Sequence, residues 1–534
     1  MTDSKQPIYI MPENVSRTVG RDAQRNNILA AKIIADVVKS TLGPKGMDKM
    51  LVDSVGNITV TNDGVTILRE MEVDHPVAKM IVDIAKTQES EVGDGTTTVA
   101  MLVGKLLENA EKLLDKRIHA SVIVKGYKIA AEKANVILNE ISLPVNNREI
   151  LRRIARTSMT GRGSDGNKDM FAELIVKSVE RIGEGREIDL NNIKIEKIKG
   201  ESIEKSELIE GIVLDKEKTH SSMPSKISGA KILLINFGLE FKNPETETRI
   251  SITTPEQLES FINAEEISLR NIAEKIIKSG ANVVFCQKGI DDLAQYYLAN
   301  AGVYACRRVA KSDIEKLSMA TSAKIISSFN ELTERDLGYA ESVEEIKSGD
   351  EAMTYVKGCR NPRAVTLLIR GSTEHVVDEI ERSFKDGLGV VASAVKEGKV
   401  VSGGGAVDIE VAKRLREFAK TIGGREQLAV EEFANAMEIV PETLAENAGL
   451  DQINILAELK QRHESGVFRD GINLFSNKIE DCFEAGILEP LKVKTQAITS
   501  AAEVANMILR IDDVLVSSGN SRDRNAVKEP ELAD

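Results

Sequence analysis

The chain has few of the residues that build metal sites, disulfide frameworks or nucleic-acid surfaces. Its 534 residues include no tryptophan, only five histidines and four cysteines, and its formal net charge is −13. The cysteines form no Cys-x-x-Cys pair and no His-Glu-x-x-His motif occurs, so neither zinc nor a disulfide scaffold is predicted. The negative charge argues against nucleic-acid binding, which needs a basic surface. A cytoplasmic protein with reduced thiols fits this composition best.

Long apolar runs are also missing. No window has the roughly 18 apolar residues of a membrane span, and the polar N-terminus lacks the apolar core of a signal peptide. No Gly-x-x-x-x-Gly-Lys-Ser/Thr sequence occurs, so a Walker-type phosphate loop is unsupported. With 42% hydrophobic and 29% charged residues, the chain has the composition of a soluble globular protein, and its length predicts several domains.

The most informative stretch is Gly93-Asp94-Gly95-Thr96-Thr97-Thr98. Apolar residues recur at helical spacing on both sides of it, Val77, Met80, Ile81 and Ile84 before and Val99, Leu102, Val103, Leu106 and Leu107 after. The stretch should therefore be a turn that opens a helix, where free N–H groups and the positive dipole end attract phosphate. Its glycines allow close approach, its threonines donate hydrogen bonds, and its aspartate suits Mg²⁺. An ordinary helix start with a threonine cap is the alternative.

Other stretches suggest the same ligand. The loop Leu42-Gly43-Pro44-Lys45-Gly46 follows a helix whose apolar stripe we expect to include Leu29, Ile33 and Val37. Asp63 lies between the strand pattern of residues 58–61 and a helix pattern, so we expect its carboxylate to be free at a strand-to-helix corner. Ser402-Gly403-Gly404-Gly405 would let the backbone approach a charged ligand, and Asp386 lies upstream of it.

Together these motifs resemble the ATP site of the chaperonins. The chain is similar to the group II chaperonins, the TCP-1 family that includes archaeal thermosome subunits and the eukaryotic cytosolic chaperonin. The resemblance extends from about residue 12 to residue 516 and rests on segments 42–50, 62–68, 93–98, 403–405 and 486–490 together with Asp386. It implies an ATP-dependent molecular chaperone that hydrolyses Mg-ATP and encloses unfolded proteins in a double-ring chamber.

The resemblance also implies roles for single residues. Asp94 would bind Mg²⁺, Asp386 would position and deprotonate the attacking water, and Asp63 would be a second carboxylate near the γ-phosphate. Arg162 stands where relatives commonly have a lysine that senses the γ-phosphate. The remaining nucleotide contacts would come from Leu42, Gly43, Pro44, Gly95, Thr96, Thr97, Thr98, Gly161, Gly404, Gly405, Asn473 and Glu489.

The order of the motifs predicts the architecture. Site candidates lie before residue 100 and after residue 380, so both ends should fold together around an inserted middle. The ends look mainly helical, whereas the middle alternates helices with apolar strand patterns at 193–198, 232–235, 283–286, 324–327 and 365–369. The resemblance implies a multidomain α+β and α/β chain. Its parts would be an equatorial ATPase domain (1–147 and 403–534), an intermediate domain (148–216 and 369–402) and an α/β apical substrate-binding domain (217–368).

A built-in lid is also implied. Thr254-Pro255-Glu256-Gln257 predicts a capped helix start, and that helix should end before Gly280. In the family, the segment corresponding to about 238–272 is a protrusion that closes the chamber, so no separate lid co-chaperonin is expected. The alternative is that the apolar residues of this segment are core: Leu239, Phe241, Ile250 and Ile252. Expected partners are unfolded clients and other subunits of the ring, not nucleic acid or membrane.

Two other classes stay open at this point. A small-molecule kinase would share the Mg²⁺–phosphate residues but need no ring. A catalytically idle scaffold subunit would keep the fold and lose the acids, and the presence of Asp63, Asp94 and Asp386 argues against it.

Overall fold

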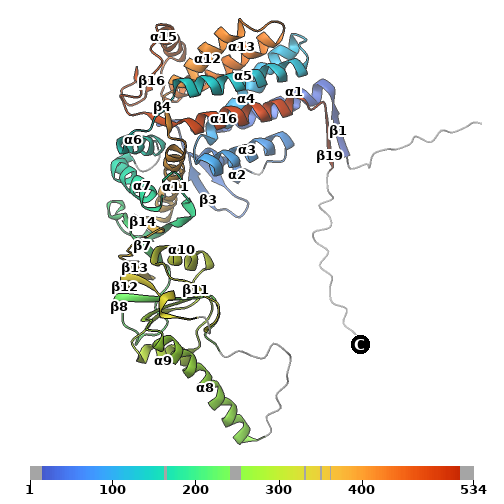
Figure 1. Cartoon of the computed structure of the whole chain (residues 1–534). Coiled ribbons are helices and arrows are strands. Elements are labelled where there is room, and N and C mark those ends of the chain that lie inside the picture. Colours follow the sequence, from blue (N-terminus) through green and yellow to red (C-terminus); the bar gives the residue numbers. More distant parts are fainter. Residues whose placement is uncertain are drawn as a thin grey trace, which may run out of the picture. The chain divides into compact units, whose positions relative to one another are not determined.

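The computed structural model describes residues 15–71, 73–161, 165–183, 185–240, 254–329, 332–348, 351–360 and 362–517 (Figure 1). Arg162 and residues 241–253 of the expected protrusion lie outside these ranges. The chain divides into two compact units. The first comprises Met1–Leu143, Val401–Ile487 and Leu491–Asp534, and the second comprises Pro144–Val400 and Leu488–Pro490. Both chain ends therefore belong to the first unit, while the three-domain division stays a prediction.

The first unit is mainly helical, with short antiparallel strand pairs. Strands β1 and β19 pair the two ends of the described chain, with Val15 opposite Ser517. Strands β2 and β3 form a hairpin, as do β16 and β17. The elements are β1 (Val15–Val19), α1 (Gly20–Lys39), β2 (Lys49–Val52), β3 (Ile58–Thr61), α2 (Gly64–Glu70), α3 (Pro76–Val92), α4 (Thr96–Asp115), α5 (Ala120–Ile141), α12 (Ala406–Ala419), α13 (Glu426–Met437), α14 (Ile439–Asn447), α15 (Gln452–Glu464), β16 (Asp470–Asn473), β17 (Lys478–Asp481), α16 (Leu491–Leu509) and β19 (Asp513–Ser517).

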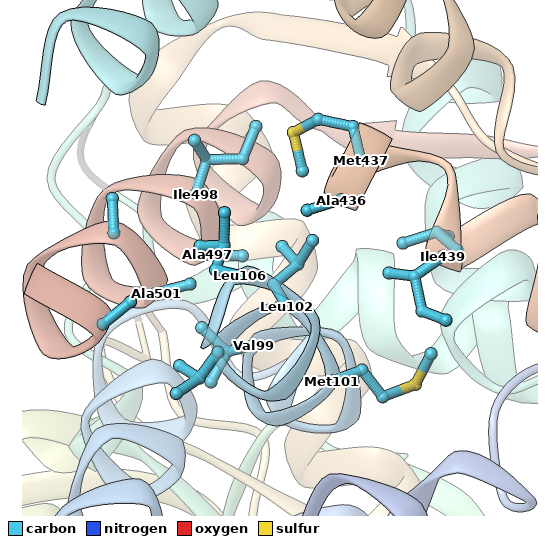
Figure 2. Packing of buried hydrophobic residues seen from close by; sticks show 14 of the residues in the cluster. Val99, Met101, Leu102, Leu106, Ala436, Met437, Ile439, Ala497, Ile498 and Ala501 are labelled. Atoms are coloured by element: carbon cyan, nitrogen blue, oxygen red, sulfur yellow. The ribbon is translucent and has the colours of Figure 1, made fainter. Parts of the chain in front are cut away.

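Helix α4 lies at the centre of this unit. Figure 2 shows its side chains facing residues of α13, α14 and α16 in one continuous apolar cluster. Val99, Leu102 and Leu106 are at most 1% exposed. A helix that is apolar on most sides must be buried on most sides, so the core fixes the position of α4 and of its first turn.

The buried face of α1 differs from the expectation. Leu29 and Ile33 are 56% and 52% exposed, so their placement in the apolar stripe was wrong. The buried face carries Ile28, Ile34 and Val38 together with alanines instead. At Ala35 helix α1 approaches α4 closely: a Cβ on Gly104 would lie 2.4 Å from the Cβ of Ala35, so this point of the contact requires small residues.

Apart from the short strands at the unit boundaries, the described part of the second unit contains helices and two separate sheets, so the described chain mixes helical and α/β parts. A three-stranded sheet has the order β5-β14-β6, and a seven-stranded sheet has the order β10-β9-β8-β12-β13-β7 with β11 beside β8. The unit's elements are α6 (Arg148–Ser158), α7 (Lys168–Ile182), β5 (Ile193–Lys199), β6 (Glu207–Ile209), β7 (Gly211–Leu214), β8 (Lys226–Ile235), α8 (Pro255–Lys278), β9 (Val283–Cys286), α9 (Asp292–Asn300), β10 (Tyr304–Cys306), α10 (Lys311–Thr321), β11 (Ile325–Ile326), β12 (Gly338–Ser348), β13 (Glu351–Lys357), β14 (Val365–Gly371) and α11 (Glu374–Glu397).

The apolar strand patterns of the middle segment are confirmed as β5, β8, β9, β11 and β14. Strands β8, β9 and β10 are parallel, as expected for an α/β arrangement. The apolar runs do not include the antiparallel hairpin of β12 and β13, because charged residues interrupt β12 (GYAESVEEIKS) and leave it no continuous apolar run. Short strands carry the chain between the units: β4 (Leu143–Pro144), β15 (Lys399–Ser402) and β18 (Leu488–Pro490).

The capped start of α8 is confirmed. The hydroxyl of Thr254 accepts a hydrogen bond from the backbone N of Gln257, and Pro255 occupies the first turn. Leu239 is fully buried and packs with Leu269 and Ile276, so it belongs to the core. Among the helices that the structure describes, none is both long and apolar enough to span a bilayer.

Candidate functional site

The Gly93–Thr98 stretch forms the predicted turn between α3 and α4. Gly93 ends α3 with φ of +81°, and Gly95 begins α4 as its N-cap with φ of +84°. Both values lie in the left-handed region that side chains with a Cβ disfavour, which explains the glycines at these positions. The N-cap is a glycine without a side chain, so the threonine-cap alternative is wrong. Thr96, Thr97 and Thr98 instead form the first turn of α4, where backbone N–H groups have no partner within the helix.

Asp94 is held at the middle of this turn. Its Oδ1 atom accepts a 2.6 Å hydrogen bond from the backbone N of Gly95, and its side chain is partly buried. Its carbonyl oxygen accepts a 2.9 Å hydrogen bond from Nε2 of Gln88. The turn is therefore fixed through both the carboxylate and the carbonyl of one residue.

Asp63 caps helix α2. Its Oδ2 atom accepts hydrogen bonds from the backbone N of Thr66 at 2.9 Å and from the Thr66 hydroxyl at 2.7 Å. The expectation of a free carboxylate was wrong, because the strand-to-helix corner leaves backbone N–H groups that a capping side chain satisfies. The start of α2 also touches the start of α4: a Cβ on Gly64 would lie 2.4 Å from Oγ1 of Thr97.

The glycine turn before α12 is enclosed by neighbouring backbone. Gly404 and Gly405 have φ of +63° and +77°. The carbonyl of Gly404 accepts a 2.8 Å hydrogen bond from the backbone N of Ile472 in β16. A Cβ on Gly405 would lie 2.6 Å from the Cβ of Pro441 in α14. Larger residues would therefore clash at both positions.

Helix α14 also contacts the loop that follows α1. Nδ2 of Asn447 donates to the carbonyls of Lys39 at 3.0 Å and Leu42 at 2.9 Å. Gly43 has φ of +83°, and a Cβ there would lie 2.5 Å from Cδ2 of Leu444. Leu42, Gly43 and Pro44 are half-buried beside this helix.

The first turn of α16 contacts both the turn before α4 and the first turn of α12. Nε2 of Gln88 also donates to the carbonyl of Val493 at 3.3 Å, and a Cβ on Gly95 would lie 3.0 Å from Cγ1 of Val493. The next residue, Lys494, forms a 3.0 Å ion pair with Asp408 in the first turn of α12. The starts of α2, α4, α12 and α16 are thus connected by direct contacts, in one continuous set. Helix N-termini gathered in this way suit a polyanionic ligand.

Asn473 is oriented by its own hairpin. Its Oδ1 atom accepts a 2.9 Å hydrogen bond from the backbone N of Phe475, and its Nδ2 atom donates to Oε1 of Glu480. The hairpin also contacts the loop after α1, because Nζ of Lys45 donates to Oδ1 of Asn477 at 2.7 Å. The proposed contact of Asn473 with a nucleotide stays a prediction.

The remaining site candidates belong to the second unit. Asp386 is buried near the middle of α11, where the ring of Phe384 lies 4.9 Å from that of Phe171. Gly161 follows α6 with φ of +85°, and Glu489 is half-buried in β18. The roles of these residues stay predictions, as does that of Arg162 outside the described residues.

The candidate site residues did not include the polar residues that connect the turns. Gln88, Asp408 and Lys494 are at most 4% exposed, and each lies on an otherwise apolar helix face. A polar residue in an otherwise apolar helix stripe is recognisable in the sequence and indicates a specific contact, since a polar side chain on a buried face needs a partner.

The chain matches known proteins over nearly its whole length. Residues 34–518 match the TCP-1/cpn60 chaperonin family. The thermosome subunit beta of Archaeoglobus fulgidus is 56% identical over 538 residues, covering 99% of both chains. This chain belongs to the TCP-1/cpn60 chaperonin family. The thermosome subunit beta of Methanothermobacter thermautotrophicus is 54% identical over 529 residues, covering 99% of this chaperonin and 98% of the relative. The thermosome subunit of Methanopyrus kandleri is 54% identical over 521 residues, covering 96% and 95%.

Family membership gives the chaperonin its general activity. It is an ATP-hydrolysing chaperone that binds nucleotide, assembles with other subunits into a ring and acts on client proteins. A small-molecule kinase is therefore excluded.

Proposed function

We propose that this chaperonin binds Mg-ATP where the starts of α2, α4, α12 and α16 are in contact, and that hydrolysis drives closure of a double-ring chamber. The observation that carries this proposal is the close approach of Gly64 to Thr97, which joins two of the predicted phosphate-binding turns. The contacts of Gly95 with the first turn of α16 extend the same set.

The residues of the first unit suit the triphosphate. Gly95 and the first-turn residues Thr96, Thr97 and Thr98 offer backbone N–H groups and hydroxyls to phosphate oxygens. Gly404 and Gly405 let the backbone of the α12 turn approach a ligand, and Gly43 of the Leu42-Gly43-Pro44 loop packs against Leu444 of the same helix, α14, that Gly405 contacts.

The Asp94 carboxylate suits Mg²⁺, because it is oriented by the Gly95 N–H and sits beside the phosphate-binding turn. A bound magnesium ion would neutralise charge on the phosphates during transfer to water. The first turn of α4 would hold the phosphates through its N–H groups while Asp94 keeps its orientation.

The hydrolytic step is assigned to carboxylates. Asp386 would position the attacking water and accept its proton, and movement of the predicted intermediate domain would deliver it. Asp63 would add a second carboxylate near the γ-phosphate while its Oδ2 atom keeps capping α2. Glu489, Asn473 and Gly161 keep their proposed nucleotide contacts, with Arg162 as the sensor of the terminal phosphate.

Closure of the chamber is assigned to the predicted protrusion. The described part of α8 exposes Ile262 and Ile267, which are 53% and 59% accessible and suit contact with clients or with neighbouring protrusions. We propose that no separate lid protein is needed.

Ring assembly has a candidate surface on the first unit. The β2–β3 hairpin exposes an apolar set that is unusual for a surface that faces only water. Its members are Met47, Met50, Val52, Val55, Ile58 and Val60, each at least 45% exposed. We propose that this hairpin contacts a neighbouring subunit.

The proposed site is tested by separating binding from turnover. Asp94→Asn should weaken binding of Mg-ATP at least tenfold, because an amide is a poor magnesium ligand, and should change magnesium-free ATP binding little. Asp386→Ala should leave binding within threefold and lower turnover about 10²-fold, roughly 3 kcal/mol of barrier. Calorimetry with and without EDTA and steady-state hydrolysis measure both.

Asp292→Asn is the matched control, since this acid lies in the first turn of α9 with a 96% exposed side chain. It should behave like the wild type in both assays. Wild-type magnesium dependence in Asp94→Asn would refute the metal assignment. Turnover within threefold of wild type in Asp386→Ala would remove that residue from the chemistry.

A further inference from the structure

Gln88 is a polar side chain on the buried face of α3. Its side chain is 0% exposed, and the same face carries Val77, Ile81, Ala85 and Val92. Nothing in the apolar pattern of α3 requires an amide at this position. The contacts of that amide therefore indicate why a polar residue occupies it.

The amide nitrogen of Gln88 joins two segments that are far apart in sequence. Its Nε2 atom donates to the carbonyl of Asp94 at 2.9 Å and to the carbonyl of Val493 at 3.3 Å. Asp94 belongs to the turn before α4, and Val493 belongs to the first turn of α16. A single NH₂ group with its two protons thus ties the turn to Val493, which lies 405 residues after Gln88.

The side chain of Gln88 also packs directly against the turn at Gly95. A Cβ on Gly95 would lie 3.0 Å from Nε2 of Gln88 and 3.0 Å from Cγ1 of Val493. The backbone at Gly95 therefore rests directly on this amide and on the valine. Any displacement of the amide would move the peptide groups of Asp94 and Gly95.

Stability alone does not explain the amide of Gln88, because its hydrogen-bonding groups are not all satisfied. Among the described residues, Oε1 of Gln88 is buried without a hydrogen-bond partner. Rotating the amide by half a turn would be worse, because an oxygen would then face the carbonyls of Asp94 and Val493. An apolar side chain of similar length would avoid the unsatisfied oxygen, yet it would lose both bonds to the turn.

We propose that Gln88 is a positioning residue for the nucleotide site. Its amide sets the orientation of the Asp94–Gly95 peptide, and through it the direction of the Asp94 carboxylate and of the first free N–H groups of α4. This inference rests on the proposed Mg-ATP site, and Gln88 itself touches neither the nucleotide nor the metal.

The test compares two replacements of similar size. Gln88→Met removes both donors and the unsatisfied oxygen, and Gln88→Glu places carboxylate oxygens against two carbonyls. We expect Gln88→Met to raise the Kd and KM for Mg-ATP about tenfold with kcat within threefold of wild type, because the site is loosened but the reacting groups are intact. Gln88→Glu should bind Mg-ATP more weakly still, because its carboxylate oxygens cannot donate to the carbonyls of Asp94 and Val493 and are repelled by them.

Gln295→Met is the matched control. This glutamine is also buried, at 3% exposure, and its Nε2 atom donates to the carbonyl of Ile290 at 2.7 Å and to Asp292 at 3.1 Å. It should lower the melting temperature about as much as Gln88→Met while Mg-ATP affinity stays unchanged. A merely structural Gln88 would give the same pattern as this control.

The outcomes separate the two proposals. If Asp94→Asn weakens Mg-ATP binding but Gln88→Met and Gln88→Glu bind like the wild type, the positioning role is wrong and the site stands. If Asp94→Asn binds like the wild type, the proposed site fails and the role of Gln88 fails with it. Should Gln88→Met not fold, the Mg-ATP affinity of Gln88→Glu decides the question: weaker binding supports the positioning role, and wild-type binding overturns it.

Discussion

The buried ion pair between Asp408 and Lys494 links the glycine turn before α12 to the first turn of α16. The two side chains are 2% and 5% exposed, and their charged atoms are 3.0 Å apart. Removing water from both charges costs several kcal/mol per ion, which their attraction offsets only while both are present. Replacing one partner leaves the other charge buried without this attraction, at a cost of about 3–5 kcal/mol.

We therefore predict strong coupling between the two positions. Asp408→Ala and Lys494→Met should each destabilise the first unit by about 3–5 kcal/mol. The double variant buries no charge and leaves only a small cavity, so its loss should be below about 2 kcal/mol. At roughly 2 °C or more per kcal/mol for a large domain, each single variant should melt about 6 °C or more below wild type, and the double variant much closer to it.

Two measurements check this prediction. Thermal melting followed by circular dichroism gives the ranking of the variants, although a chain of two units need not unfold in one step. Hydrogen exchange of peptides from α12 and α16 locates the effect, because opening there should become faster in the single variants only. A double variant as unstable as the sum of the two single variants would refute the coupling. So would single variants that melt within about 2 °C of wild type.

The remaining predictions concern acid stability and the lid. Burial opposes ionisation of Glu410, but hydrogen bonds from His463 at 2.9 Å and Arg414 at 2.7 Å outweigh it and hold the pKa of this carboxyl below its usual value. The stabilisation that the ionised Glu410 contributes should therefore be complete above about pH 5 and disappear as the pH falls through the lowered folded-state pKa. Between about pH 3 and 7, the melting temperature of Glu410→Gln should accordingly depend less on pH than that of the wild type. Replacing residues 241–253 by a short Gly-Ser linker, with buried Leu239 and the cap Thr254 kept, should preserve ATP hydrolysis but abolish protease protection of a trapped client. Full protection would show that another segment closes the chamber.

The predicted helix starts, both at the site and at α8, were predictable because their determinants are local. Gly95 and Gly405 adopt positive φ, and Thr254 accepts a bond from a residue three positions later. Such conformations depend on the residue itself and on its nearest neighbours in sequence. Motif spacing therefore predicts these turns without reference to any tertiary contact.

The errors at α1 and Asp63 have different causes. The predicted stripe of α1 contained Leu29 and Ile33, but the buried face carries Ile28 and Ile34, one position away from each. Helix α1 thus has two overlapping apolar stripes, and packing against Gly104 of α4, more than 60 residues later, selects the stripe that also carries Ala35. Asp63 did have a local signal, because Thr66 follows it at the spacing of a capped helix start. A carboxylate at a strand-to-helix corner should be tested first as a cap, and only then as a free acid.

Motif spacing could not predict the contacts that Gln88 and Lys494 make, because neither these two residues nor their partners Val493 and Asp408 are among the candidate site residues. Gln88 reaches Val493 across 405 residues, and Lys494 reaches Asp408 across 86. Both connections end on the first turn of α16, one through a backbone carbonyl and the other through a side chain. Losing the bond from Gln88 should therefore disturb only the turn before α4, and losing the Lys494–Asp408 ion pair should disturb only the turn before α12. A shift of α16 itself should disturb both turns. If the turns bind the same nucleotide, the first turn of α16 is where a change at one turn is passed to the other.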